Sequence, residues 1–176
     1  MQCTPAGSDL QCSVTYEEMG YCANPTPRDF TNSARWISSD ASVATFRVPG
    51  SLKVIASGQI QVYAQSLANQ YIVSETQAFV VAPGQAPERL ANIGVGVQDA
   101  NTKRFIQGAT VELEPSRGQS QTCQTNQNGQ CQFWSYAVQT TLRASSSGYS
   151  PAEVSVTPLT TCYCSGTLLG LSPLPQ

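Results

Sequence analysis

The fold of the first half of the chain is decided by one stretch, Arg35-Trp36-Ile37-Ser38-Ser39-Asp40-Ala41-Ser42-Val43-Ala44-Thr45-Phe46. It predicts a strand with a buried Trp36, then a turn, then a second short strand that ends on Phe46. The turn falls on Ser38-Ser39-Asp40, because Ser and Asp side chains can accept hydrogen bonds from nearby backbone N–H groups. We therefore expect Trp36 to be a core residue and Asp40 to cap the turn rather than bind a ligand.

The rest of the chain repeats this pattern of short strands and turns. Apolar residues alternate with polar ones around Leu10 and Cys12, and again around Val95 and Val97, which is the period of a half-buried strand. Turn residues recur roughly every 8 to 12 positions, and no segment of useful length has a helical period. The sequence therefore predicts an all-β chain of two consecutive immunoglobulin-like (Greek-key) β-sandwich domains.

The boundary between the two predicted domains lies at Pro83-Gly84-Gln85-Ala86-Pro87, where two prolines and a glycine interrupt the strand pattern. We place the first domain at residues 1–82, a linker at 83–91 and the second domain at 92–176. Domains of this size have modest cores, so covalent cross-links would add usefully to their stability.

The chain has seven cysteines and no histidine, which indicates an oxidising compartment and disulfide bonds. The cysteines are Cys3, Cys12, Cys22, Cys123, Cys131, Cys162 and Cys164. Because their number is odd, one thiol is free, joins another chain or pairs outside this segment. The last four would make a poor zinc site, because their spacing does not match the usual two-to-four-residue knuckle. We therefore expect no bound metal.

One disulfide is expected to join Cys123 and Cys131. These cysteines bracket Asn128-Gly129, a dipeptide that favours a type I′ turn, so the segment predicts a β-hairpin with the disulfide across it.

A disulfide between Cys12 and Cys22 is the second expected pairing. Cys162 and Cys164 point to the same face of a strand and cannot easily pair with each other. One of them is therefore expected to join Cys3 or to reach another chain, although sequence alone does not fix the connectivity.

The charge of the chain excludes some classes of partner. Charged residues make up 11% of the chain and the net charge is −2, so there is no basic patch for phosphate and we expect no nucleic-acid partner. No run approaches the roughly 18 apolar residues of a membrane span. Residues 1–3 do not begin a signal peptide.

Catalysis is not expected either. Without histidine, the chain lacks Ser-His-Asp and Cys-His nucleophilic sites and the commonest general base at neutral pH. Glu112 and Glu114 lie on one strand face about 7 Å apart, a spacing that could suit glycoside hydrolysis. We expect both to face solvent opposite Val111 and Leu113, and we expect no cofactor.

Two aromatic residues are candidates for binding, Trp134 and Tyr136. Trp134 directly follows Phe133 in a strand, so one of these two must face outward unless a bulge intervenes. An exposed aromatic ring could stack on a sugar or pack on a neighbouring subunit, and burial at a domain contact is the alternative.

Residues Asp9 to Ala64 resemble a bacterial Ig-like domain of group 2. The resemblance is carried by Thr15-Tyr16, Phe30-Thr31, the Trp-x-Ser-Ser-Asp-x-Ser-Val-Ala-Thr run within residues 34–46, and residues 50–64. Cys12, Cys22 and the proline-containing loop between them depart from the family pattern.

Residues Ile93 to Leu171 resemble a carboxypeptidase regulatory-like (transthyretin-like) domain. The matching segments are Val97 to Asp99, Ile106 to Val111, Thr125 to Gly129, Ala144, and Gly148 to Ala152. Asn126 stands where an aspartate is usual in the family, which removes a carboxylate that calcium binding would use.

Both resemblances imply β-sandwich spacers of surface, adhesive or secreted multi-domain proteins, and neither implies catalysis. They lead us to expect a non-enzymatic structural or adhesive module, extracellular or at a bacterial cell surface, with protein partners. Self-association into a fibre or layer would suit the low charge and the odd cysteine count. The alternative is a carbohydrate-binding accessory module.

Overall fold

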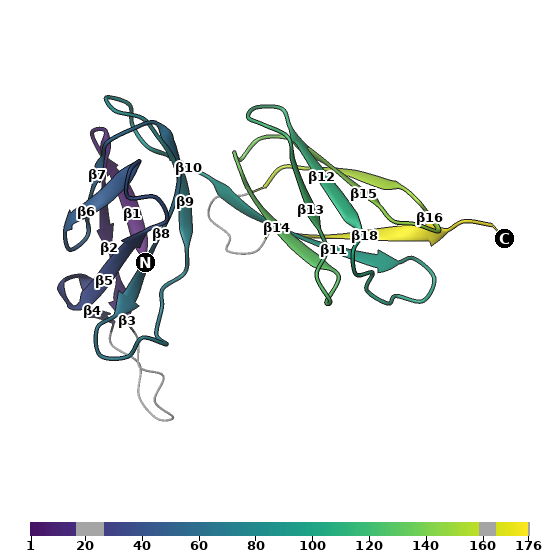
Figure 1. The fold of residues 1–176 in the computed structure, drawn as a ribbon, viewed down its shortest axis with the longest axis horizontal. Coiled ribbons are helices and arrows are strands. Elements are labelled where there is room, and N and C mark those ends of the chain that lie inside the picture. The colour runs from purple at the N-terminus through teal and green to yellow at the C-terminus, as the bar shows by residue number, and fades with distance from the viewer. Residues whose placement is uncertain (17–26, 159–164, 176) are drawn as a thin grey trace. The chain divides into compact units, whose positions relative to one another are not determined.

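The chain forms two compact units, Met1–Arg89 (unit 1) and Leu90–Gln176 (unit 2). The computed structural model describes residues 1–16, 27–158 and 165–175 (Figure 1). Within these residues the regular elements are strands, apart from one turn of 3-10 helix, η1 (Thr31–Ser33). The predicted fold class is confirmed: the chain is all-β and consists of two immunoglobulin-like β-sandwiches.

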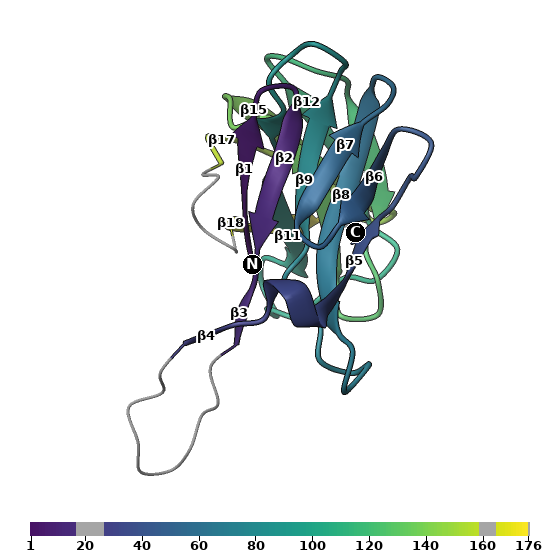
Figure 2. The ribbon, with the colours of Figure 1, turned by 90° about the vertical axis from the view of Figure 1, so that its left-hand side faces the viewer.

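Unit 1 packs two four-stranded sheets face to face (Figure 2). The first has the order β1-β2-β7-β6 and comprises β1 (Gln2–Ala6), β2 (Asp9–Ser13), β7 (Ser51–Val54) and β6 (Ala44–Val48). The second has the order β10-β9-β8-β5 and comprises β10 (Glu88–Arg89), β9 (Gln77–Val81), β8 (Gly58–Ser66) and β5 (Ala34–Ser38). A short ribbon extends beyond the sheets and consists of β3 (Thr15–Tyr16) and β4 (Arg28–Asp29). Strand β10 falls inside the segment predicted as a linker.

The core of unit 1 lies between these two sheets. Leu10 and Leu52 come from the first sheet, and Ile60, Val62 and Phe79 come from the second. Each of them is at most 1% exposed. The alternation of apolar and polar residues accounts for this core, because successive side chains of a strand point to opposite faces.

Trp36 on β5 is partly buried against this core. Its ring centroid lies 5.2 Å from that of Phe46, and its Nε1 donates a hydrogen bond to the Thr31 carbonyl oxygen at 2.9 Å. The polar end of the indole is thereby satisfied. Asp40 caps the following turn as predicted, since its Oδ1 accepts the Ser42 backbone N–H at 2.9 Å. A hydrogen bond from the Ser42 hydroxyl is the main cause that lowers the pKa of Asp40.

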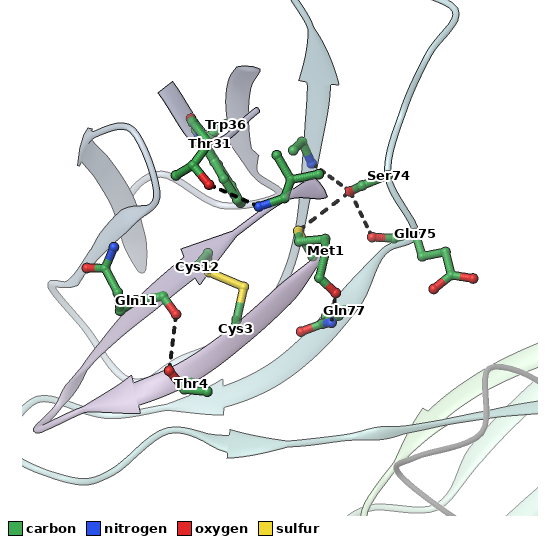
Figure 3. Close-up of a disulfide and its surroundings, with 12 residues drawn as sticks. Met1, Cys3, Thr4, Gln11, Cys12, Thr31, Trp36, Ser74, Glu75 and Gln77 are labelled. Atoms are coloured by element: carbon green, nitrogen blue, oxygen red, sulfur yellow. Dashed lines mark hydrogen bonds between the residues drawn. A yellow bond between two sulfur atoms is a disulfide. The ribbon is translucent and has the colours of Figure 1, made fainter. Parts of the chain in front are cut away.

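A disulfide joins Cys3 on β1 to Cys12 on β2, directly opposite each other in the antiparallel register (Figure 3). Both cysteines belong to the core of unit 1, where they are 7% and 1% exposed. The predicted pairing of Cys12 with Cys22 is therefore wrong, as is the pairing of Cys3 with Cys162 or Cys164. The reason is the β1–β2 hairpin, whose first strand is mostly polar and gave no strand pattern.

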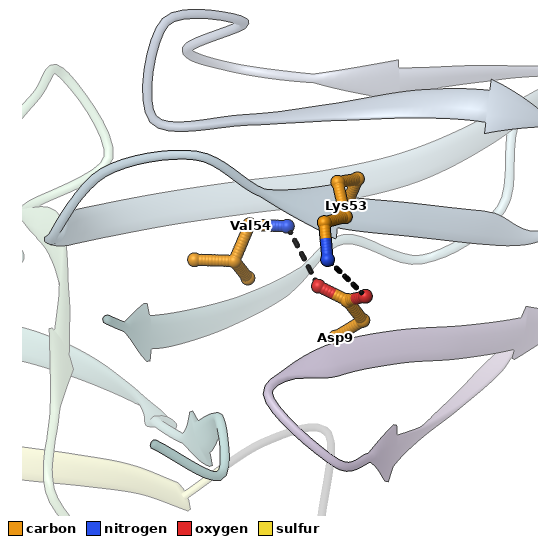
Figure 4. A network of polar contacts seen from close by, with 3 residues as sticks. All are labelled: Asp9, Lys53 and Val54. Carbon is orange, nitrogen blue, oxygen red and sulfur yellow. Dashed lines mark hydrogen bonds and ion pairs between the residues drawn. The ribbon is translucent and has the colours of Figure 1, made fainter. Parts of the chain in front are cut away.

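An ion pair connects β2 to β7 (Figure 4). Asp9 Oδ2 lies 3.0 Å from Lys53 Nζ, and Asp9 Oδ1 accepts the Val54 backbone N–H at 3.0 Å. These interactions, the bond from Val54 first, lower the pKa of Asp9. The start of β2 is thus fixed to the end of β7.

Unit 2 is a second sandwich of two four-stranded sheets. The first has the order β14-β11-β18-β16 and comprises β14 (Gln130–Ser135), β11 (Ala91–Asp99), β18 (Ser165–Pro173) and β16 (Tyr149–Ser150). The second has the order β13-β12-β15-β17 and comprises β13 (Gln121–Gln124), β12 (Thr110–Pro115), β15 (Thr140–Ser145) and β17 (Ala152–Val156). Strands β11 and β18 pair in parallel.

The core of unit 2 is formed where β11 faces β12. Ile93, Val95 and Val97 point inward from β11, and Val111 and Leu113 point inward from β12. None of these side chains is more than 2% exposed. This arrangement follows from the period-two pattern of both strands.

Cys123 and Cys131 form a disulfide with each other, the pairing expected from the sequence. They do not, however, belong to a β-hairpin, so the hairpin prediction is wrong. Cys123 on β13 lies opposite Val111 in one sheet, and Cys131 on β14 lies opposite Val95 in the other sheet. Strand β13 pairs with the preceding strand β12, and β14 pairs with β11, so β13 and β14 do not pair with each other. The disulfide therefore joins the two layers of the sandwich.

The turn between these strands is built around Asn126. Its carbonyl oxygen accepts the Gly129 N–H at 2.8 Å, and its side-chain Oδ1 accepts the N–H groups of Asn128 at 2.9 Å and Gln130 at 3.1 Å. The predicted type I′ turn is wrong, because it would require a positive φ at Asn128. In the described part of the chain, Lys103 is the only non-glycine residue with a positive φ.

Candidate functional site

The outer face of the sheet β14-β11-β18 is hollowed, and its floor is made of glycine. Because β11 alternates, Gly94 and Gly96 face outward while Val95 and Val97 face the core. On β18, Gly166 lies directly opposite Gly94. The hollow above these residues has a volume of about 450 Å³. We call this hollow the glycine trough.

The structure of unit 2 gives no steric reason for glycine at two of the three floor positions. A methyl group added at Gly94 or Gly166 would have no atom of a non-adjacent described residue within 4 Å, and neither glycine has a positive φ. At Gly96 the added carbon would lie 3.0 Å from Leu168 Cδ1. Glycine weakens a strand and often marks a place where a ligand or another backbone approaches closely. The glycine floor therefore allows a ligand to approach the backbone of the sheet closely.

Amide side chains form one wall of the glycine trough. Gln130 and Gln132 on β14 lie opposite Gly96 and Gly94, and both are exposed. Gln132 Nε2 donates a hydrogen bond to Asn92 Oδ1 at 2.6 Å, which orients that amide. An amide can both donate and accept hydrogen bonds, so this wall can bind hydroxyl or amide groups of a ligand.

Apolar side chains form the rest of the rim. Leu168 on β18 stands across β11 from the glutamine wall and is 56% exposed. Phe105, 53% exposed, lies on the β14 side of β11, where it forms a β-bridge to Gln98 beyond the end of β14. The side chains that line the trough are all neutral. The trough therefore suits an uncharged ligand with both apolar and hydrogen-bonding surface.

Of the two predicted binding aromatics, only Trp134 lies on this face. Phe133 is buried and Trp134 is half-buried, so Trp134 points outward, two residues beyond Gln132 on the same strand. Tyr136 lies past the end of β14. The Arg117 guanidinium covers one face of the Tyr136 ring at 4.3 Å from the ring centroid. The structure thus separates the two residues and places Trp134 next to the trough.

Unit 1 carries a second hollow, of about 320 Å³, which we call the apolar groove. One side is formed by Tyr16 and Phe30, whose ring centroids are 5.6 Å apart in an edge-to-face arrangement. The other side is formed by Ile72 and Val73, and Ala64 lies between them. Among the residues that the structure describes, the side chains that line the groove are all uncharged.

The surroundings of the apolar groove are also apolar and exposed. Tyr71 is 85% exposed, Leu67 is 69% exposed and Val73 is 55% exposed. These side chains follow β8 in the chain. Val73 lines the groove, and Leu67 and Tyr71 are neighbours in sequence of its lining residues Ala68 and Ile72. Exposed apolar residues that gather in one place mark an interaction site more often than scattered single residues do.

The carboxylates considered for catalysis form an ordinary solvent face. Glu112 and Glu114 are exposed on β12, opposite the buried side chains of the same strand, as predicted. Glu112 lies across from Arg143 on β15, and the Arg143 guanidinium pairs with Glu153 at 2.8 Å. The bond to Glu153 is the main cause that raises the pKa of Arg143. These carboxylates border neither hollow described above.

Asp99, which sequence reasoning did not single out, is 7% exposed at the end of β11. Its Oδ1 accepts the N–H groups of Asn101 at 2.8 Å and Thr102 at 2.7 Å, and its Oδ2 accepts the Tyr149 hydroxyl at 3.1 Å. The bond from Thr102 is the main cause that lowers the pKa of Asp99, while the bond to Asp99 raises the pKa of Tyr149. Donors of the chain itself satisfy this carboxylate, so it caps a turn.

Among residues 1–16, 27–158 and 165–175, no cluster of three or more potential side-chain ligands is arranged to hold a metal ion. The same residues contain no helix of the length and apolarity that a membrane crossing requires. Cys22, Cys162 and Cys164 lie outside the described residues.

Sequence reasoning missed both hollows. Glycine alternates with valine along β11, and this pattern was visible in the sequence. It predicts a hollow only if the strand that pairs with β11 also places a glycine beside it, as β18 does with Gly166. The apolar groove draws its sides from segments about 40 residues apart, Phe30 and Ile72, and no local pattern links them.

Comparison with known proteins finds no matching family model and no matching curated protein. Among solved structures, the TIE protein of Bacillus anthracis is similar with 12% identity and a TM-score of 0.44, covering 81% of this chain and 31% of that chain. The shaft pilin SpaA from Lactobacillus rhamnosus GG is similar with 11% identity and a TM-score of 0.40, covering 76% of this chain and 70% of that chain.

A C-terminal fragment of the pilus adhesin SpaC from Lactobacillus rhamnosus GG is also similar, with 14% identity and a TM-score of 0.43. The match covers 73% of this chain and 81% of that fragment. Likenesses this distant carry no inference about function.

Proposed function

We propose that the chain is a non-enzymatic structural or adhesive module of a bacterial surface or secreted protein, and that it assembles through the apolar groove of unit 1. The surface or secreted location rests on the cysteine usage and on the resemblance to bacterial Ig-like and carboxypeptidase regulatory-like domains. Each unit has its own closed core and its own disulfide, as independent spacer domains require.

The observation that carries the assembly is the exposed apolar surface around the groove. Tyr71, Leu67 and Val73 keep more than half of their surface exposed, although burying a large apolar side chain gains roughly 1.5 to 3 kcal/mol. The described residues that line the groove carry no charge, which favours an apolar partner surface. A second copy of the chain can supply one through Val48 or Ile55, which are 60% and 50% exposed at opposite ends of the β6–β7 pair. A contact between two different patches repeats from copy to copy and builds a fibre.

Light scattering on the oxidised protein over a range of concentrations tests this proposal. We expect the average mass to rise with concentration in the wild type and to stay near that of a monomer in a Leu67→Ser/Tyr71→Ser double variant. Gln59→Ser, an exposed change outside the groove, is the matched control and should associate like the wild type. A wild type that remains strictly monomeric at high concentration would contradict the assembly.

A second candidate function is favoured by the glycine trough: binding of a neutral carbohydrate. A pyranose ring presents C–H groups on its faces and hydroxyl groups around its rim. The first could lie on the glycine floor against Phe105, and the second could bond to Gln130 and Gln132. The trough lies on the face of a sheet, where the floor offers no free backbone hydrogen-bonding groups, so a peptide strand would leave its own backbone unsatisfied.

Substitution of the floor glycines separates this function from a structural role. The methyl groups of Gly94→Ala and Gly166→Ala meet no atom of a non-adjacent described residue within 4 Å, so we expect each change to leave unit 2 equally stable or more stable by about 0.5 kcal/mol. The same changes should weaken the binding of a neutral glycan found on a glycan array. Glycan binding that is unchanged by both substitutions and by Trp134→Ala, or an array without binding, would contradict this function.

A further inference from the structure

The first and last strands of unit 2 lie side by side and run in the same direction. Strand β11 enters the unit and β18 leaves it, and they pair over seven consecutive positions, from Ile93 opposite Ser165 to Asp99 opposite Leu171. The two ends of unit 2 are therefore carried by adjacent strands, and this pairing decides how the unit responds when its ends are pulled apart.

We propose that unit 2 is a load-bearing domain in which the β11–β18 ladder resists tension by shear. Tension on the chain pulls β11 by its N-terminal end and β18 by its C-terminal end. Because the strands are parallel, these forces slide one strand lengthwise along the other. The backbone hydrogen bonds lie across the strands, so they are loaded together instead of opening one at a time. The inference rests on the proposed structural role, since a spacer in a surface assembly transmits tension.

The packing of both strands strengthens this ladder. On its other side, β11 is held by β14 over six positions, from Ala91 opposite Ser135 to Gly96 opposite Gln130. Leu169 and Leu171 of β18 are buried, at 4% and 0% exposure, in the core that β11 also lines. Sliding β18 would drag these side chains out of a close-packed interior. The weaker side of β18 faces β16, which pairs at only two positions.

The disulfide of unit 2 lies outside the strands that receive the load. Cys123 and Cys131 are on β13 and β14, so the ladder must fail before tension reaches their bond. After the β11–β18 ladder has broken, the disulfide still prevents the segment between Cys123 and Cys131 from being stretched out. In unit 1, by contrast, β1 and the last strands, β9 and β10, belong to different sheets. Unit 1 therefore lacks this geometry and provides an internal comparison.

Single-molecule force spectroscopy on the full oxidised chain, held at its two ends, tests the proposal. We expect two unfolding events, the stronger of which belongs to unit 2. A Cys123→Ala/Cys131→Ala variant identifies that event, because removing a bond that spans 8 residues and whose Cα atoms lie 6.4 Å apart lengthens its extension by about 20 Å. If the event that the variant lengthens is the one that occurs at the lower force, the proposal is overturned.

A change of pulling geometry tests the direction of the load. A tether inserted after Ala137 and used with the N-terminal end of unit 2 loads β11 against β14, an antiparallel pair whose ends meet at Ala91 and Ser135. That pair should unzip, at a force lower by roughly twofold or more than the end-to-end pull. Equal forces in the two geometries would overturn the proposal.

A matched pair of core substitutions separates shear resistance from overall stability. Leu171→Val lies on β18, and Leu142→Val lies on β15 outside the ladder; both side chains are 0% exposed. We expect similar losses of equilibrium stability, with a reduced unfolding force only for Leu171→Val. An equal reduction in both would overturn the proposal. Because assembly is measured separately by light scattering, a chain that assembles but fails these force tests would remove the load-bearing role and leave the proposed function standing.

Discussion

Cys123 and Cys131 lie on strands of opposite sheets, so their disulfide joins the two layers of unit 2. The disulfide of unit 1 differs, because Cys3 and Cys12 face each other within one sheet. The chain also has two tryptophans, Trp36 in unit 1 and Trp134 in unit 2. Tryptophan fluorescence can therefore follow each unit separately.

Removing the disulfide between the layers should destabilise unit 2 alone. We expect Cys123→Ala/Cys131→Ala to lower the free energy of unfolding by about 2 to 3 kcal/mol, since the bond closes a short loop and restricts the unfolded chain. Urea unfolding followed through Trp134, in a Trp36→Phe background, measures the loss. Cys3→Ala/Cys12→Ala is the control; it should leave the Trp134 transition unchanged and shift only the Trp36 transition, which is followed in a Trp134→Phe background. A shift of both transitions by one variant would contradict independent units.

Gly129→Ala should be far more harmful than Gly108→Ala. Both glycines have a positive φ, 66° and 73°, and both substitutions therefore cost about 1 kcal/mol or more in backbone strain. At Gly129 the added carbon would also lie 2.7 Å from Phe105 Cβ and 2.9 Å from the Val97 carbonyl oxygen, whereas at Gly108 it meets nothing within 4 Å. We expect thermal unfolding to show a lower Tm for Gly129→Ala; equal Tm values would contradict the close packing.

Asn126 should be replaceable by aspartate but not by alanine. The Asn126 Oδ1 accepts two backbone N–H groups, and a carboxylate oxygen can do the same. We expect Asn126→Ala to cost about 1 to 2 kcal/mol and Asn126→Asp to cost little at neutral pH. Chemical unfolding of both variants at pH 7 measures the difference, and a loss for Asn126→Asp as large as that for Asn126→Ala would show that the amide nitrogen is needed.

Asp9 should make unit 1 sensitive to acid. Its pKa is lowered in the folded chain by the Val54 N–H and by Lys53, so the unfolded chain binds the proton more readily. The stabilisation is complete above the ordinary aspartate pKa of about 3.9 and is lost as the pH falls through the lower folded value. Between pH 7 and pH 2, wild-type unit 1 should lose more stability than Asp9→Asn does. Parallel pH profiles for the two proteins would contradict this role.

Much of the fold follows from local patterns in the sequence. The alternation around Val95 and Val97 correctly placed these residues in the core, because a strand exposes one face and buries the other. Asp40 was correctly assigned to a turn for an equally local reason, since its partner Ser42 is two residues away. Patterns of this kind require no knowledge of the rest of the chain.

Features that depend on pairing between distant strands were not predictable in the same way. Asn128-Gly129 indicates a tight turn, but no local signal says whether the flanking strands pair with each other or leave for different sheets. Cys12 is separated from Cys3 and from Cys22 by similar numbers of residues. Strand β1 places Cys3 opposite Cys12, but its mostly polar sequence does not predict a strand. The glycine trough exists only because Gly94 meets Gly166, about 70 positions later in the chain.

The parallel pairing of β11 with β18 also governs when unit 2 can fold during synthesis. Strand β18, which completes the sheet β14-β11-β18-β16, is synthesised after the other strands of unit 2 that the structure describes. Parallel pairing across such a long separation in sequence is slow. Before β18 is synthesised, the edge of β11 that will pair with it has no partner. The segment from Cys123 to Cys131 has already left the ribosome at that time. If the Cys123–Cys131 disulfide formed at that stage, it would already hold β13 and β14 of the two sheets together. Fewer conformations would then remain to be sampled before β18 pairs with β11.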